Sequence, residues 1–230
     1  MTSTGTAPAW WCIGILICIQ IVLGILLWIF TYAANCNLVQ LINSDIFVFC
    51  VSLAGSIINL CILGVFLRQE TEGACELLGI RKPPNTMFLS GSLFCVGWAI
   101  IIIILAANNK LGGHSDYQVL FRKSATSKTY LSVSLLLAPF FEEPLFRGFL
   151  YRVFRRSYKT STACVIIVSL ALILHMDRAF SSLWIAFSLT LLNVLLCLTW
   201  EKSLRIWNCV LIHLIYNSTL LIGWYYLSIK

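Results

Sequence analysis

The side chains of this sequence that could perform chemistry gather in three short stretches of its second half. They are Glu142, Glu143 and Arg147 in EEPLFR, His175 at the end of ALILH, and His213 and Asn217 in HLIYN. Each stretch lies in or beside an apolar run, where an ionisable group is costly and is by default a candidate for function. Hydrolysis of an amide bond uses a carboxylate, imidazoles and an amide as base, orienting group and hydrogen-bond donors.

The two adjacent glutamates are expected to have different roles. On a helix, Arg147 lies about 40° from Glu143 and about 140° from Glu142, because successive residues are about 100° apart. Glu143 and Arg147 are therefore expected to form an i,i+4 ion pair, which makes both charges tolerable in a bilayer. Glu142 points elsewhere and is the candidate general base. Pro144 leaves the carbonyl of Phe140 without its backbone donor, and we expect a kink there that opens a polar cavity.

The helices that position these groups are expected to cross a membrane. The chain has 230 residues, of which 60% are hydrophobic and 11% are charged, which excludes a soluble domain. A spanning helix needs about 20 apolar residues, so the sequence predicts an all-α, polytopic membrane helix bundle of about seven transmembrane helices. The expected spans are Trp10–Tyr32, Ile46–Phe66, Met87–Ala106, Tyr130–Phe154, the shorter Thr162–Met176, Ala179–Trp200 and Ile206–Ile229.

Other features of the composition exclude several classes of protein. The first span lacks a basic leading region and exceeds the usual apolar length of a signal peptide, so we expect it to be retained. Most of the ten cysteines stand singly in apolar runs, which favours packing over disulfides or metal binding. The net charge of +7 suits membrane lipids with anionic headgroups. Because no soluble domain presents the basic residues, we expect no nucleic-acid partner.

Polar groups at depth are expected almost entirely in the second half of the chain. Residues 1–128 are predicted to be a scaffold of three spans with a surface loop, and residues 129–230 a catalytic core of four spans. Counting 1.5 Å per residue from the basic end of each helix gives a depth of about 18 Å for Glu142, His175 and Asn217, and about 12 Å for His213. Antiparallel neighbours would bring these groups to a shared level. Asn193, also at depth, is interpreted as an interhelical packing residue.

The three stretches resemble the motifs of the CPBP intramembrane proteases, also called Abi or CAAX-processing proteases, which include type II prenyl endopeptidases. The family's E-E-x-x-x-R motif is here Glu142 to Arg147, its F-x-x-x-H motif is Ala171 to His175, and its H-x-x-x-N motif is His213 to Asn217. Alanine replaces the usual aromatic residue of the second motif. Asn193 and Cys197 stand where the family commonly has glycines.

The resemblance implies an intramembrane glutamate-dependent endopeptidase without metal or other cofactor. Glu142 and His175 would hold and activate a water, and His213 and Asn217 would donate to the oxyanion, with Glu143 and Arg147 supporting Glu142. The implied substrate is a membrane-associated peptide or protein that can be lipidated: a CAAX-like C-terminus, a pheromone or a bacteriocin-type leader. The implied location is a bacterial-type cytoplasmic membrane, in which the chain is a multi-pass protein.

Two other readings of the polar cluster stay open at this point. The departure in the second motif is compatible with a non-catalytic family member that acts as a bacteriocin-immunity protein or membrane scaffold. Glu142, His175 and His213 are also residue types that ligate zinc or relay protons in a carrier. The chain lacks the H-E-x-x-H signature of zinc proteases. It also lacks the paired repeats that carriers usually show.

Overall fold

The computed structural model describes residues 74–80, 82–108, 125–175 and 182–229, with scattered residues between 7 and 18 and between 54 and 68. Throughout these ranges the regular elements are helices, and no strand occurs among them. The expected all-α membrane bundle is thereby confirmed for this part of the chain. The first two expected spans, Trp10–Tyr32 and Ile46–Phe66, lie largely outside the described residues, as does most of the loop before the fourth.

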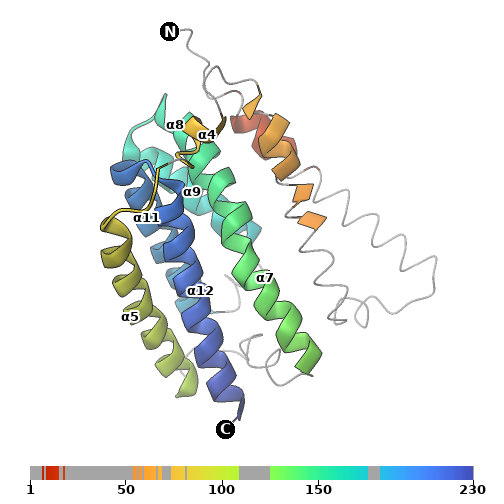
Figure 1. Ribbon diagram of the computed structural model, residues 1–230, viewed down its shortest axis with the longest axis vertical. Coiled ribbons are helices and arrows are strands. Elements are labelled where there is room, and N and C mark those ends of the chain that lie inside the picture. The colour runs from red at the N-terminus through yellow and green to blue at the C-terminus, as the bar shows by residue number, and fades with distance from the viewer. Residues whose placement is uncertain are drawn as a thin grey trace, which may run out of the picture.

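The described helices pack as a bundle with their long axes roughly aligned (Figure 1). In chain order they are α4 (Ala74–Leu77), α5 (Met87–Ala107), α7 (Ala125–Glu143), η1 (Pro144–Tyr151), α8 (Arg152–Arg155), α9 (Thr160–Leu174), α11 (Leu183–Ser203) and α12 (Ile206–Ile229). Helix α12 packs against α5, α7 and α11, and α11 also packs against α9. The C-terminal helix is therefore the common neighbour of the bundle's other long helices.

Three of these helices are long and apolar enough to cross a membrane: Met87–Ala107, Leu183–Ser203 and Ile206–Leu227. They correspond to three of the expected spans, and the chain is accordingly an integral membrane protein. Helix α9 is apolar but shorter, with 15 residues, as expected for the short span. The helical run that contains the glutamates, α7 and η1, is not among the three.

The helix changes type at the proline where a kink was expected. Pro144 begins η1, an eight-residue π-helix whose remaining residues, 145–151, are all buried. A π-helix pairs residue i with i+5, so it is wider than an α-helix, and such segments are frequent at functional sites. The chain thus accommodates Pro144 by a change of helix type directly after the glutamates, and the kink itself stays a prediction.

One end of the bundle is held by polar contacts between segments distant in sequence. The indole of Trp207 donates to the carbonyl of Ile80 at 2.8 Å, and Arg205 donates to the carbonyl of Pro83 at 2.6 Å. Asn208, which is fully buried, donates to the side chain of Asn85 at 2.6 Å. These bonds tie the segment before α5 to the start of α12, which fixes the two helices relative to each other.

A second cluster at the same end joins η1, α8, α9 and α11. Arg155 pairs with Glu201 at 2.8 Å, and the same carboxylate accepts hydrogen bonds from Tyr151 and Thr160. Four elements therefore meet at one glutamate near the basic end of the bundle. Because η1 is anchored here, its other end, where the paired glutamates lie, is held at a defined depth.

Candidate active site

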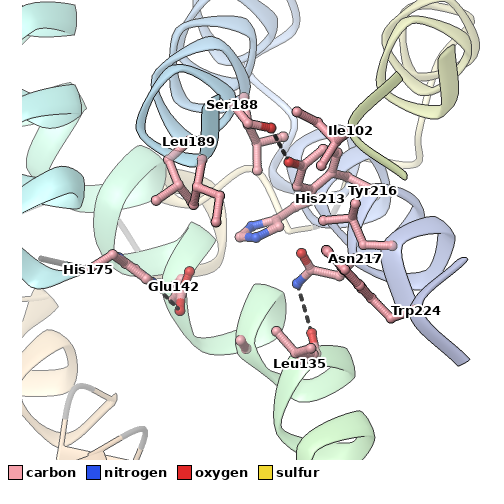
Figure 2. A pocket seen from close by; sticks show the side chains of 14 residues that line it. Ile102, Leu135, Glu142, His175, Ser188, Leu189, His213, Tyr216, Asn217 and Trp224 are labelled. Carbon is pink, nitrogen blue, oxygen red and sulfur yellow. Dashed lines mark hydrogen bonds and ion pairs between the residues drawn. The ribbon is translucent and has the colours of Figure 1, made fainter. Parts of the chain in front are cut away.

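The four residues predicted to carry out chemistry all line one pocket. Glu142, His175, His213 and Asn217 reach it from α7, the end of α9 and α12 (Figure 2). Helices α5 and α11 complete the wall, mainly with apolar side chains: Ile102, Ile185, Leu189 and Leu192. The pocket thus combines a few convergent polar groups with an apolar lining, the usual character of a ligand site.

Glu142 and His175 face each other on one side of this pocket. The Oε1 atom of Glu142 lies 4.0 Å from Nε2 of His175, and the two side chains are 26% and 24% exposed. Helix α9 ends at Leu174, so His175 lies just beyond the helix rather than inside the expected span Thr162–Met176. Its Nδ1 is 2.8 Å from the carbonyl oxygen of Ala171. A carbonyl only accepts, so Nδ1 donates and the neutral ring presents an acceptor Nε2 to Glu142.

The expected ion pair between Glu143 and Arg147 is present and buried. Nη1 of Arg147 donates to Oε1 of Glu143 at 3.1 Å, and the side chains are 2% and 0% exposed. Glu143 does not line the pocket. Adjacent glutamates therefore occupy different environments, one at the pocket and one sealed in the core.

His213 connects the buried pair to the pocket. Its Nδ1 lies 2.7 Å from the same Oε1 of Glu143 that accepts from Arg147, while its ring also lines the pocket. Spacing within one helix predicted the pair of Glu143 and Arg147, and the family resemblance implied that this pair supports Glu142. Glu143 also contacts His213 on α12, a contact that spacing within one helix does not reveal.

Asn217 closes a gap that a proline leaves in α7. Pro139 lies inside that helix and has no N–H, so the carbonyl of Leu135 lacks its usual donor four residues later. Nδ2 of Asn217 donates to this carbonyl at 2.8 Å. An amide nitrogen carries two protons, and one of them is used here. Pro139, which was not singled out from the sequence, is therefore the proline whose missing donor Asn217 replaces.

Three further polar residues were missed or underestimated by sequence reasoning. Asn193, interpreted as a packing residue, accepts a 2.6 Å hydrogen bond from Arg147 and donates to Leu189 at 2.8 Å. Ser188 and Tyr216 line the pocket and are hydrogen-bonded to each other (Figure 2). The only sequence signal for these was the depth of Asn193 and the position of Tyr216 inside the motif HLIYN; a serine in an apolar helix gives none.

Acidic, imidazole and thiol side chains are the groups that could ligate a metal ion in this chain. Among the residues that the structure describes, no three His, Cys, Asp or Glu side chains come together as a metal-binding group. The pair of Glu142 and His175 stands on one side of the pocket, and His213 is engaged by Glu143 through Nδ1. The arrangement is a carboxylate–imidazole pair opposite two possible hydrogen-bond donors.

Comparison with known proteins gives one match. Residues 125–219 match the model of the family described as "Type II CAAX prenyl endopeptidase Rce1-like". No curated protein and no solved structure matches the chain. The matched segment begins with α7 and ends within α12, so it contains all six residues singled out in the three motifs. Residues 125–219 therefore form an Rce1-like domain of the CPBP/CAAX family of membrane proteases.

Proposed function

We propose that this protein is an intramembrane glutamate-dependent endopeptidase that hydrolyses a peptide bond of a membrane-associated substrate. The observation that carries the proposal is the opposition of Glu142 and His175, 4.0 Å apart at the wall of a pocket that His213 and Asn217 also line. Family membership supplies the class of reaction, and the apolar lining suits a substrate delivered from lipid.

Glu142 acts as the general base on a water bound between its carboxylate and Nε2 of His175. Both of these atoms accept hydrogen bonds, so the water donates one proton to each and turns a lone pair toward the scissile carbonyl carbon. Glu142 takes a proton as the new C–O bond forms. When the tetrahedral intermediate collapses, the C–N bond breaks and Glu142 returns that proton to the leaving amine. The products are a carboxylic acid and an amine.

His213 and Asn217 are assigned to the oxyanion of this intermediate. Both line the pocket on α12, one turn apart, and face the Glu142 side (Figure 2). Asn217 has one amide proton bound to Leu135 and a second for the substrate oxygen. Donors aimed at developing charge in a water-poor site are typically worth about 10²–10³ in rate each. The reaction as written uses no metal ion.

The substrate is expected to be a peptide or protein held at the membrane, with a CAAX-like C-terminus, a pheromone or a bacteriocin-type leader as candidates. A multi-pass arrangement in a bacterial-type cytoplasmic membrane belongs to the same proposal. A suitable probe is an internally quenched peptide with an S-farnesyl cysteine three residues before its end, tested beside its unprenylated twin. Cleavage of only the farnesylated form selects the CAAX-like class.

The decisive variant is Glu142→Gln, which keeps the shape of the side chain and removes the base. We expect kcat on the farnesylated probe to fall by about 10²–10⁴-fold, the usual contribution of a general base. Glu76→Gln, at an exposed position of α4, is the matched control and should be unaffected. Full activity of Glu142→Gln would refute the mechanism. An inactive wild-type protein, folded and inserted, would favour the non-catalytic reading.

Metal independence has its own measurement. Purified protein is assayed on the same probe with and without 1,10-phenanthroline, and its metal content is determined by elemental analysis. We expect unchanged kcat and less than one bound metal per ten chains. Stoichiometric zinc that is lost together with activity would instead assign Glu142, His175 and His213 to a metal site.

A further inference from the structure

We propose that three buried residues, Asn193, Arg147 and Glu143, form a positioning relay that binds Nδ1 of His213 and directs Nε2 into the pocket. The proposal rests on the function assigned above, because it concerns which atom of His213 meets the substrate. It adds Asn193 to the residues on which the site depends. It also gives Glu143 a second role beside its pairing with Arg147, as the group that binds His213.

The contact between Glu143 and His213 fixes which group is the donor. Oε1 of Glu143 already accepts from Nη1 of Arg147 at 3.1 Å and lies 2.7 Å from Nδ1 of His213. Arginine is always charged, and among the described residues Arg147 forms its ion pair with Glu143, so ionised Glu143 is what balances it. An ionised carboxylate only accepts, so Nδ1 of His213 must carry a proton.

Arg147 is in turn held from α11. Its Nη2 donates to Oδ1 of Asn193 at 2.6 Å and to the backbone carbonyl of the same residue at 3.3 Å. Asn193 is itself fixed, because its Nδ2 donates to the carbonyl of Leu189 at 2.8 Å. Arg147 is 1% exposed and Asn193 is 8% exposed, so water competes little for these bonds. The relay therefore runs unbroken from α11 through η1 and α7 to α12.

The relay determines what His213 can offer to a substrate. With Nδ1 bound to Glu143, the nitrogen available at the pocket is Nε2. A neutral ring in this tautomer presents Nε2 as an acceptor, and a doubly protonated ring presents it as a donor. The oxyanion role assigned to His213 therefore needs the doubly protonated ring, whose charge Glu143 stabilises directly. The hydrogen bond that one ring nitrogen makes to a carboxylate commonly determines which nitrogen of a functional histidine carries the proton.

Nuclear magnetic resonance of the histidine rings tests this tautomer without any activity measurement. The chain has only three histidines, so ¹⁵N-histidine labelling in micelles gives three ring systems, and loss of one set in His213→Gln identifies it. We expect Nδ1 of His213 to carry a proton in the folded protein, as its contact with Glu143 requires. A neutral His213 with a bare Nδ1 and a protonated Nε2 would overturn the proposal.

Substitutions of the relay residues should shift the tautomer of His213 by different amounts. Glu143→Gln removes the charge, and the tautomer protonated only at Nε2 should become populated. Because this variant leaves Arg147 unbalanced, the double variant Glu143→Gln/Arg147→Met serves if the single one does not fold. Asn193→Leu should give an intermediate shift. If it leaves the spectrum of His213 unchanged, Asn193 is not part of the relay.

Asn208→Leu is the matched control for Asn193→Leu. Asn208 is another buried asparagine with a structural hydrogen bond, but its partner is Asn85 at the end of the bundle. Its replacement should lower stability without changing the His213 tautomer. If this control shifts the His213 signals as much as Asn193→Leu does, the shift reflects a general loss of stability. The tautomer of His213 would then not depend on the relay.

Kinetics of the farnesylated probe separate this inference from the proposed function. The double variant should lower kcat at least tenfold with KM within about twofold, because the ring is misdirected while the apolar lining is intact. If Glu142→Gln stays active while Nδ1 of His213 is protonated as stated, the mechanism fails and the relay stands. If Glu142→Gln is inactive and the tautomer is the opposite one, the relay fails and the mechanism stands.

Discussion

At the scale of single residues, the molecule separates two chemically identical side chains by what surrounds them. Glu142 stands at the pocket wall, a quarter exposed, opposite His175. Glu143 is fully buried between Arg147 and His213. A buried carboxylate with a guanidinium and an imidazole as partners is a structural charge, whereas a carboxylate at a pocket is accessible to a substrate water.

This separation predicts a large and non-additive effect of the buried pair on stability. Arg147→Met leaves Glu143 without its cationic partner and should lower the free energy of unfolding by about 3–5 kcal/mol. The double variant Glu143→Gln/Arg147→Met removes both charges and should cost clearly less than the single one. Unfolding of the micelle-bound protein by denaturant measures both. A double variant as unstable as the sum of the two single variants would contradict the prediction.

The residues of the site were predictable to different degrees, for physical reasons. The pair of Glu143 and Arg147 followed from spacing on one helix, since i,i+4 side chains are neighbours. The contact of His213 with Glu143 joins residues 70 positions apart. No periodicity encodes such a contact, and only the packing of α12 against α7 brings it about. The catalytic roles of these residues stay predictions.

At the scale of elements, the helix with the glutamates departs twice from an ordinary α-helix. Pro139 interrupts the bonding of α7, and Pro144 begins the π-helical segment η1. The first defect is filled by Asn217 from α12. The sequence predicted that proline would disturb the helix. It did not predict that the disturbance would include a π-helix, because proline's missing donor can be accommodated in more than one way.

The filled defect predicts a measurable coupling between Pro139 and Asn217. Asn217→Leu leaves the carbonyl of Leu135 unsatisfied and should cost about 1–3 kcal/mol of stability. In a Pro139→Ala background the new backbone N–H reaches that carbonyl, so the same substitution should cost about 1 kcal/mol less. A double-mutant cycle of unfolding free energies measures the difference.

Thr219→Val provides the control for this cycle. Its hydroxyl donates to the carbonyl of Ile215 within α12, so its loss removes a hydrogen bond that does not involve α7. The cost of Thr219→Val should be the same with Pro139 or Ala at position 139. Equal coupling of Thr219 and Asn217 to position 139 would show that the proline acts on the bundle as a whole.

At the scale of the whole molecule, successive long helices of the described part alternate in direction, so the connections between α8 and α9 and between α11 and α12 lie at the same end (Figure 1). Basic residues of these connections include Lys159, Lys202 and Arg205. Nine lysines and arginines are expected at the connections after the second, fourth and sixth expected spans, and six on the opposite side, so the positive-inside rule predicts that the former side is cytoplasmic. The all-α architecture was predictable because apolar length alone specifies a spanning helix. The end of α9 at Leu174 was not predictable from apolar length, since the direction of the chain there depends on the neighbouring helices.

The orientation can be measured by labelling single cysteines with an impermeant maleimide in intact cells and in inverted vesicles. Lys159 and Lys202 are exposed at the basic end, and Asn108 is exposed beyond α5. In a background without the native cysteines, Lys159→Cys and Lys202→Cys should react only from the cytoplasmic side, and Asn108→Cys only from the opposite side. Labelling of Lys159→Cys and Asn108→Cys from one side would contradict the arrangement.

The late partners of the buried charges have a consequence for how the protein is made. Arg147 meets Asn193, 46 residues later, and Glu143 meets His213, 70 residues later. Glu143 and Arg147 pair with each other within the α7–η1 run, but a chain that enters the membrane as it is synthesised inserts this pair before its later partners exist. Asn193 arrives with α11, and His213 arrives with α12, the last described helix, which packs beside α7. We therefore expect the α7–η1 segment to reach its final contacts only after α12 has inserted, so chains truncated before α12 should be substrates for membrane quality control.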